Sequence, residues 1–207
     1  MIAAMNIPEV NDPHGLAVRP DVLCTAVSAR LEDVTPTEAT ALLRAAAAAL
    51  QARAAGLHPG AELSGRRLDL GRHSGEKAAK SASGDAQLDG VLLVPLDPAA
   101  DFWARADLVA RLTEALRALT LELAKSKSPV RLGFRPPVAR VRDALPHRAE
   151  LTARFRAQLR ALTEGSSERA GSGGWEIPDE IVQQAVSLDE VRLLLVAARR
   201  SGSSREG

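Results

Sequence analysis

The chain has 207 residues, of which 45% are hydrophobic and 2% aromatic, so it can bury a sizeable core that is almost wholly aliphatic. Its 27 basic and 26 acidic side chains give a net charge of +1, which argues against a polycation that coats nucleic acid or anionic lipid. A single cysteine, Cys24, excludes an internal disulfide and a cysteine-based metal cluster. No apolar run has the length of a membrane-spanning helix and no secretory signal is recognisable, so the sequence favours a cytoplasmic protein.

The chain begins with an irregular arm, a strand and a helix. Residues 1–20 are rich in proline and show little periodicity. Residues 21–33 alternate apolar and polar side chains, which predicts a strand with one buried face. Thr35 and Glu38 form a capping box, and the helix that starts there is expected to end at Gly56.

The middle of the chain contains a long polar connection, a strand and a second helix. Residues 57–89 are predominantly polar, and only 66–70 suggest a short strand within them. GRHSGEKAAKSASGD, residues 71–85, has the glycines and lysines of a phosphate-binding loop without its spacing, and is interpreted as a solvated loop. Residues 90–96 are an apolar run of strand length, and a helix is expected over 99–125.

Two short strands and a third helix follow. Residues 129–134 and 138–142 have strand patterns, and Pro136-Pro137 between them indicates an edge position or a strand pair. A third helix is expected over 146–165. The sequence thus predicts an α+β domain over 21–164, a small mixed sheet covered by helices on one face.

The C-terminal part is expected to be a helical appendage on a linker. Residues 165–174 have the composition of a Gly/Ser linker, and residues 201–207 are expected to be disordered. Residues 175–200 are amphipathic, and Ser187 with Glu190 repeats the capping-box spacing, which predicts a helical tail.

The segment RPDVLCTAVSARLEDVTPTEATALLRAAAAALQARAAGL resembles the opening of SIMPL domains, in which an Arg-Pro-Asp entry leads into a strand and then a helix. The segments GVLLVPL…DFWARADLVARLTEALRAL and VRLGF…HRAELTARFRAQLRAL are similar to that family's later strand–helix units, so the resemblance covers roughly 18–163. It implies a mixed α+β fold without catalytic residues and, in some members, ring-like oligomers. Two departures are the lack of a leader and the lack of a strong hairpin over 57–89.

Two sets of residues are candidates for binding. The tail offers an apolar side for a protein partner or a second copy of the chain: Trp175, Ile181, Leu188, Val191, Leu194 and Leu195. The same side would serve equally to fold back on its own domain. Arginines crowd the segment 131–160 and suggest an alternative site for an anion or nucleic acid: Arg131, Arg135, Arg154, Arg156 and Arg160.

No catalytic motif, cofactor motif or metal-ligand spacing stands out, and the four histidines are read as surface residues. The sequence therefore favours a non-enzymatic assembly or adaptor protein that self-associates or binds a protein partner through a sheet edge or the tail, with no cofactor. The alternatives are an anion or nucleic-acid binder that uses the 131–160 arginines, and an enzyme whose site is assembled from dispersed residues.

Overall fold

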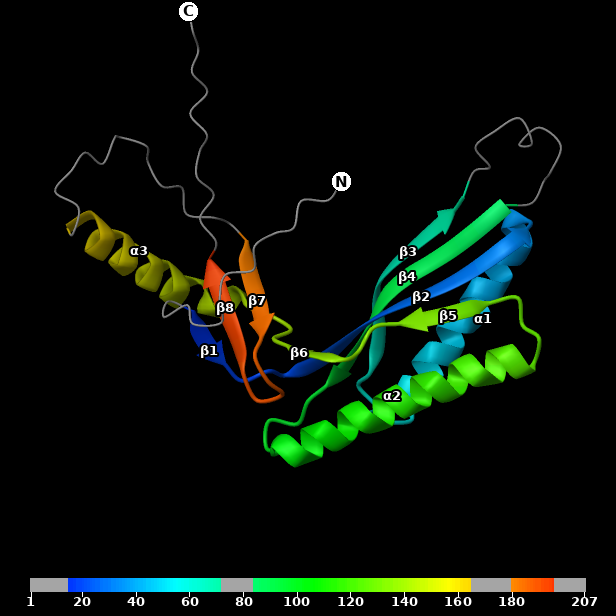
Figure 1. Cartoon of the computed structure of the whole chain (residues 1–207), viewed down its shortest axis with the longest axis horizontal. Helices are drawn as coiled ribbons and strands as arrows, with labels where there is room; N and C mark the ends of the chain where they lie inside the picture. The colour runs from blue at the N-terminus through cyan, green and yellow to red at the C-terminus, as the bar shows by residue number, and fades with distance from the viewer. Residues whose placement is uncertain (1–14, 72–83, 165–179, 196–207) are drawn as a thin grey trace, which may run out of the picture. The chain divides into compact units, whose positions relative to one another are not determined.

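The computed structural model describes residues 15–71, 84–164 and 180–195. The chain is an α+β protein, as the sequence predicted, and it divides into two compact units. The first unit is Pro20–Arg140, and the second unit combines Met1–Arg19 with Val141–Gly207. Each unit contains its own antiparallel sheet, labelled in Figure 1.

The first unit has a β-α-β-β-α-β order with one further strand. Its elements are β2 (Val22–Val34), α1 (Pro36–Ala55), β3 (Glu62–Leu70), β4 (Gly84–Pro95), α2 (Phe102–Lys125), β5 (Arg131–Phe134) and β6 (Val138–Arg140). The sheet order is β3-β4-β2-β5 with antiparallel neighbours throughout, which is the split β-α-β arrangement of ferredoxin-like folds. β6 pairs with β2 on the same edge as β5, after the bend at Pro136-Pro137.

β2 gives the sheet two chemically different faces. Because side chains alternate along a strand, its odd positions from 23 to 31 share one face, and all five are buried: Leu23, Thr25, Val27, Ala29 and Leu31. Its even positions from 24 to 30 are Cys24, Ala26, Ser28 and Arg30, which are only partly buried or exposed. We call this second face the open face. The predicted strand over 21–33 is confirmed, and its pattern decides which side the helices cover.

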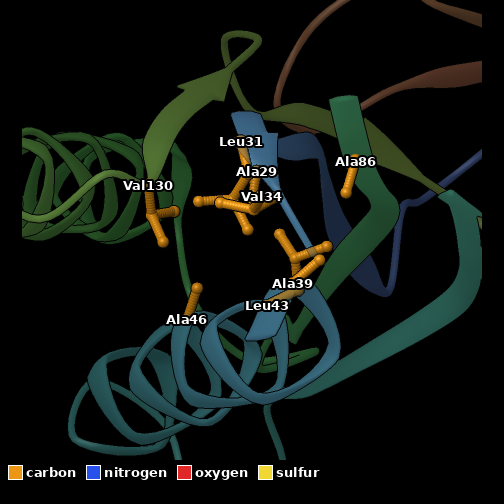
Figure 2. Packing of buried hydrophobic residues seen from close by; sticks show 8 residues of the cluster. All are labelled: Ala29, Leu31, Val34, Ala39, Leu43, Ala46, Ala86 and Val130. Carbon is orange, nitrogen blue, oxygen red and sulfur yellow. The ribbon is translucent and has the colours of Figure 1, made fainter. Parts of the chain in front are cut away.

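α1 and α2 pack on the odd-numbered face of β2. α1 begins as predicted, since the Thr35 hydroxyl accepts a hydrogen bond from the Glu38 N–H at 3.3 Å. Leu43 and Ala46 of α1 join Ala29 and Leu31 of β2 in a buried cluster, and Leu123 of α2 packs against it. Figure 2 shows eight residues of this cluster. The core is aliphatic, as the composition predicted.

The polar connection expected over 57–89 is in part a hairpin. β3 and β4 pair antiparallel from Glu62 to Leu70, although the sequence suggested only a short strand over 66–70. Within β3 only Leu63 is buried, because β3 lies at the edge of the sheet and needs no alternating pattern. Residues 72–83, most of the glycine- and lysine-containing stretch, lie outside the described residues.

The second unit corrects the prediction for both ends of the chain. Its elements are β1 (Leu16–Val18), η2 (Leu145–His147), α3 (Arg148–Glu164), β7 (Ile181–Ala185) and β8 (Val191–Leu195), with the sheet order β1-β8-β7. Residues 16–18 of the expected irregular arm are therefore a strand. The expected helices over 175–200 are, within residues 180–195, a β-hairpin.

The hairpin turn explains why this prediction failed. The Ser187 hydroxyl accepts hydrogen bonds from the N–H groups of Asp189 and Glu190, both at 3.1 Å, which is the contact a helix cap also makes. Here the contact closes a turn, because Val191 and Leu193 pair with β1 as well as β7 and become fully buried. Residues 165–174, Trp175 and residues 201–207 lie outside the described part of the chain.

Thr25 is a polar residue within the apolar core. Its hydroxyl is fully buried on the helix-covered face and has no hydrogen-bond partner among the described residues. We expect Thr25→Val to raise the free energy of unfolding by about 1 kcal/mol, because it removes a desolvated hydroxyl and keeps the shape. Thr25→Ser keeps the hydroxyl, loses a methyl and should lower it by about 1 kcal/mol. Denaturant unfolding measures both; a loss of stability in Thr25→Val would contradict this reading.

Arg105 is a buried cation, with 1% of its surface exposed. Its guanidinium donates hydrogen bonds to the carbonyls of Pro20, Asp97 and Ala100 at 3.2 to 3.4 Å. It thus joins the start of β2 to the loop before α2. We expect Arg105→Met to lower the free energy of unfolding by about 3 kcal/mol, because buried carbonyls lose a charged donor.

The exposed Arg117→Met on the same helix is the control and should change stability by less than about 0.5 kcal/mol. Equal stabilities of the two variants in denaturant unfolding would show that Arg105 does not hold this junction.

Candidate functional site: a groove between α1 and β3

A groove of about 460 Å³ runs between α1 and the edge strand β3. Its polar lining residues are Thr40, Arg44, Gln51 and Arg66. Its apolar lining residues come from both elements and from β4: Leu43, Ala47, Ala48, Leu63, Leu68 and Leu88. This size and this mostly apolar lining are typical of sites for small molecules.

The groove exists because α1 presents small side chains to an edge strand with large ones. Leu63 and Leu68 of β3 stand opposite Leu92 and Leu88 of β4, which places them on the helix side of the sheet. The facing residues of α1 include Ala47 and Ala48, from a run of five alanines, and these do not fill the space. Leu68 therefore stays 47% exposed.

A second hollow of about 500 Å³ extends the groove toward the beginning of α1. It shares Thr40 and Arg44 with the first hollow and adds Leu70, which is 40% exposed. The two hollows together form an elongated apolar channel, and Arg44 lies at their junction. An extended ligand fits this shape better than a compact one.

Gln51 holds the other end of the groove in place. Its side-chain amide donates to the Ala61 carbonyl at 2.6 Å, and its side-chain oxygen accepts from the Leu63 N–H at 2.7 Å. The two hydrogen bonds connect α1 to the residue before β3 and to the second residue of β3, so the width of the groove is set there by Gln51.

The charge at the groove is positive. The residues that line its two hollows include no Asp or Glu. Arg44 and Arg66 are exposed, and neither side chain has a hydrogen bond or an ion pair with another described residue. Two unpaired guanidinium groups beside an apolar channel favour a ligand that carries negative charge.

Both edges of the first unit's sheet are poorly suited to strand addition. β3 has a bulge between Ser64 and Arg67, with Gly65 at φ 58°, and its exposed side chains include two arginines and an aspartate. The opposite edge consists of the short strands β5 and β6 on either side of Pro136-Pro137. Bulges, charges and prolines are the features that protect sheet edges from pairing with another chain.

The described residues among those predicted to bind a partner lie in the β7–β8 hairpin of the second unit. Ile181 lies in β7 and Leu188 in the following turn, while Val191, Leu194 and Leu195 lie in β8. Val191 and Leu194 are buried within their own unit. Trp175 lies outside the described residues. A role of these residues in partner binding stays a prediction.

The arginines of the 131–160 segment do not form one element. Arg131 lies in β5 and Arg135 directly after it, in the first unit. Arg154, Arg156 and Arg160 lie on α3, in the second unit. Arg131 pairs with Glu32 at 3.2 Å, and Arg154 pairs with Glu150 at 2.7 Å. Sequence reasoning missed Arg44 and Arg66, because nothing in their local sequence signals an unfilled groove.

Within residues 15–71, 84–164 and 180–195, no three His, Cys, Asp or Glu side chains are gathered as metal ligands would be. The helices of the same ranges include none with the length and apolar character needed to span a bilayer.

Comparisons with known proteins found similarity among solved structures. No protein-family model and no curated protein matches the sequence. A hydantoinase/carbamoylase family amidase from Burkholderia ambifaria aligns over 67% of this chain and 34% of its own, with 17% identity and a TM-score of 0.37.

Two further structures give similar values. An amidase of the same family from Burkholderia phymatum covers 69% of this chain and 37% of its own, with 21% identity and a TM-score of 0.39. The Bacillus subtilis YXEP protein, a dinuclear metal binding peptidase from the M20 family, covers 67% and 32%, with 12% identity and a TM-score of 0.26. The chain spans about a third of the length of these structures, and similarity at this level carries no activity to it.

These findings correct three sequence-based predictions. The expected membership of the SIMPL family is wrong, since the structures found are amidases and a peptidase. The assignments as a non-enzyme and as a self-associating scaffold or adaptor are likewise overturned, because the proteins found are enzymes. The hairpin that the SIMPL resemblance required over 57–89 is present as β3 and β4, but its presence does not change this correction.

Gln51 gives a test of how the groove is held. We expect Gln51→Leu to lower the free energy of unfolding by about 1 to 3 kcal/mol, because the partly buried N–H of Leu63 and C=O of Ala61 lose their partner. Hydrogen exchange of the Leu63 amide should quicken. Gln158→Leu on α3, a glutamine without a side-chain hydrogen bond in the described structure, is the matched control. Unchanged exchange at Leu63 would contradict the anchoring role.

Proposed function

We propose that the first unit binds a single-chain amphiphile with an anionic head, of which a long-chain carboxylate is the simplest form, in the groove between α1 and β3. The observation that carries the proposal is an elongated apolar groove whose only charged lining residues, Arg44 and Arg66, are unpaired among the described residues.

The apolar part of such a ligand accounts for the leucines. Leu68 and Leu70 expose apolar surface beside each other on the helix side of β3, at the mouths of the two hollows. An alkyl chain lying along them would remove that surface from water, at about 0.8 kcal/mol for each methylene buried. The length of the channel suits a chain rather than a ring.

The anionic head accounts for the arginines. Arg44 belongs to both hollows and Arg66 to one, so a head group near their junction can reach both guanidinium groups. The guanidinium fork matches a carboxylate in a bidentate geometry. Because both arginines are exposed, their contribution should fall as the salt concentration rises.

A peptide strand is a less suitable occupant. An added strand would have to pair with β3 across its bulge and its charged side chains, Arg66, Arg67 and Asp69. A free amphiphile needs no hydrogen bonds from the edge of the sheet.

The cytoplasmic location of the protein stays a prediction from the sequence, and binding of an amphiphile in the groove is compatible with any compartment.

Calorimetric titration of the full chain with octanoate, decanoate and dodecanoate, and with the matching alcohols, tests the proposal. We expect each added methylene to tighten binding about fourfold, because about 0.8 kcal/mol per methylene corresponds to that factor. Carboxylates should bind more tightly than alcohols of equal length at low salt. Leu68→Asp should abolish both, while Leu121→Asp, an equally polar change at an exposed leucine of α2, should not.

The double variant Arg44→Gln with Arg66→Gln separates the two parts of the site. It should reduce carboxylate binding to the level of the alcohol and leave alcohol binding unchanged. Arg111→Gln with Arg117→Gln on α2 changes the net charge equally and should have no effect. Affinity without chain-length dependence would overturn the proposal, and so would a concentration-dependent dimer that Leu68→Asp dissociates, because a second copy would then occupy the groove.

A further inference from the structure

The open face of the first unit's sheet carries a separate hollow, of about 630 Å³, on the side of the sheet away from α1 and α2. Its floor is built from small residues on adjacent strands. Ser28 of β2 stands opposite Gly133 of β5 on one side and Asp89 of β4 on the other, and Ala26 stands opposite Val91. A Cβ at Gly133 would lie 3.1 Å from the Ser28 hydroxyl oxygen, so the absence of a side chain at Gly133 keeps the bottom of the hollow open.

Three arginines line the hollow around this floor, two from strands and one from the residue that follows a strand. Arg30 comes from β2, Arg67 from β3, and Arg135 follows β5 with its N–H bonded to the Ala26 carbonyl at 2.9 Å. None of the three side chains has a hydrogen bond or ion pair with another described residue. Three chain segments far apart in the sequence thus place unpaired cations around one hollow.

The acidic groups near the hollow are already engaged. Asp89 is the acidic residue in its lining, and both of its carboxylate oxygens accept from the Gln87 side-chain amide at 2.7 Å. Glu32 pairs with Arg131, which stands opposite Arg30 in the register. The lining therefore has three arginines against one carboxylate, and its charge is positive.

We infer that this hollow binds a small oxyanion with two or more negative charges. Guanidinium groups bind phosphate and carboxylate oxygens through paired N–H donors, and a floor of glycine, alanine and serine lets such a group approach the sheet closely. The site is distinct from the 131–160 segment predicted from the sequence, since Arg135 is its sole member from that set and Arg30 and Arg67 complete it.

Single-stranded nucleic acid is a poorer ligand for this face. Bases bind sheets by stacking on aromatic side chains. Phe134 of β5 also lines the hollow, but it stands opposite Val27, whose side chain lies on the helix-covered face, so the register places the Phe134 ring on that face as well. The open face supplies charge without a stacking surface, which favours a compact anion.

Calorimetric titration of the full chain with pyrophosphate and with citrate, at low and high salt, tests the inference. We expect one-to-one binding of at least one probe, weakened by high salt. Tighter pyrophosphate binding would assign a phosphate-bearing ligand, and tighter citrate binding a polycarboxylate. Arg30→Gln with Arg135→Gln should weaken the binding about tenfold or more, since the loss of even one charged hydrogen bond has an effect of that size. Arg111→Gln with Arg117→Gln on α2 is the charge-matched control.

A steric variant distinguishes a built site from general attraction. Ala26→Leu fills the floor and leaves the net charge unchanged, so it should abolish binding, whereas Ala45→Leu at an exposed position of α1 should not. Absence of binding by both probes at millimolar concentration would overturn the inference. Equal losses in the two arginine pairs, or full binding by Ala26→Leu, would overturn it as well. Leu68→Asp in the groove should leave this binding intact, so the two proposals can fail separately.

Discussion

The pairing of β2 on both of its edges is the constraint on which the first unit depends. β4 lies along one edge and β5 with β6 along the other, so the backbone groups of β2 are used in both directions. The surroundings of its side chains therefore depend only on the face of the sheet on which each side chain lies. The odd positions from 23 to 31 are apolar apart from Thr25, and they form the face that α1 and α2 cover. The other face is left with Ser28 and Arg30, which require water or a polar ligand.

Both proposed binding sites follow from this division. On the covered side, the helices pack well over β2 and β4, but at β3 the alanines of α1 leave Leu68 and Leu70 partly uncovered. On the open side, small residues at the middle of the sheet and arginines toward its margins create a positively charged hollow. One sheet thus offers an apolar groove and a polar hollow on opposite faces, with different ligand chemistry expected at each.

The correction of the adaptor assignment shows that the absence of catalytic motifs from a sequence is weak evidence about its function. The adaptor assignment depended on missing catalytic patterns, and the comparisons instead found amidases and a peptidase among the similar structures. Those similarities are too low to carry an activity, so the functional proposals depend on the geometry of this chain alone. The sheet edges, which the sequence suggested for partner binding, are bent by a bulge on one side and interrupted by prolines on the other.

The sequence by itself determined the elements whose signals are local. The alternation of β2, the Thr35 cap of α1 and the end of α2 at Lys125 follow from neighbouring residues, because face and capping are decided within a few positions. The sequence pattern places the start of α2 at residue 99, three residues before Phe102, where the Asp101 cap begins the helix. Tertiary structure decided the rest. The Ser187 pattern became a turn once β8 was buried between β1 and β7. Arg44 and Arg66 line one groove because α1 packs over the edge strand β3, and Arg30, Arg67 and Arg135 line one hollow because segments far apart in the chain lie in the same sheet. No local sequence pattern records either arrangement.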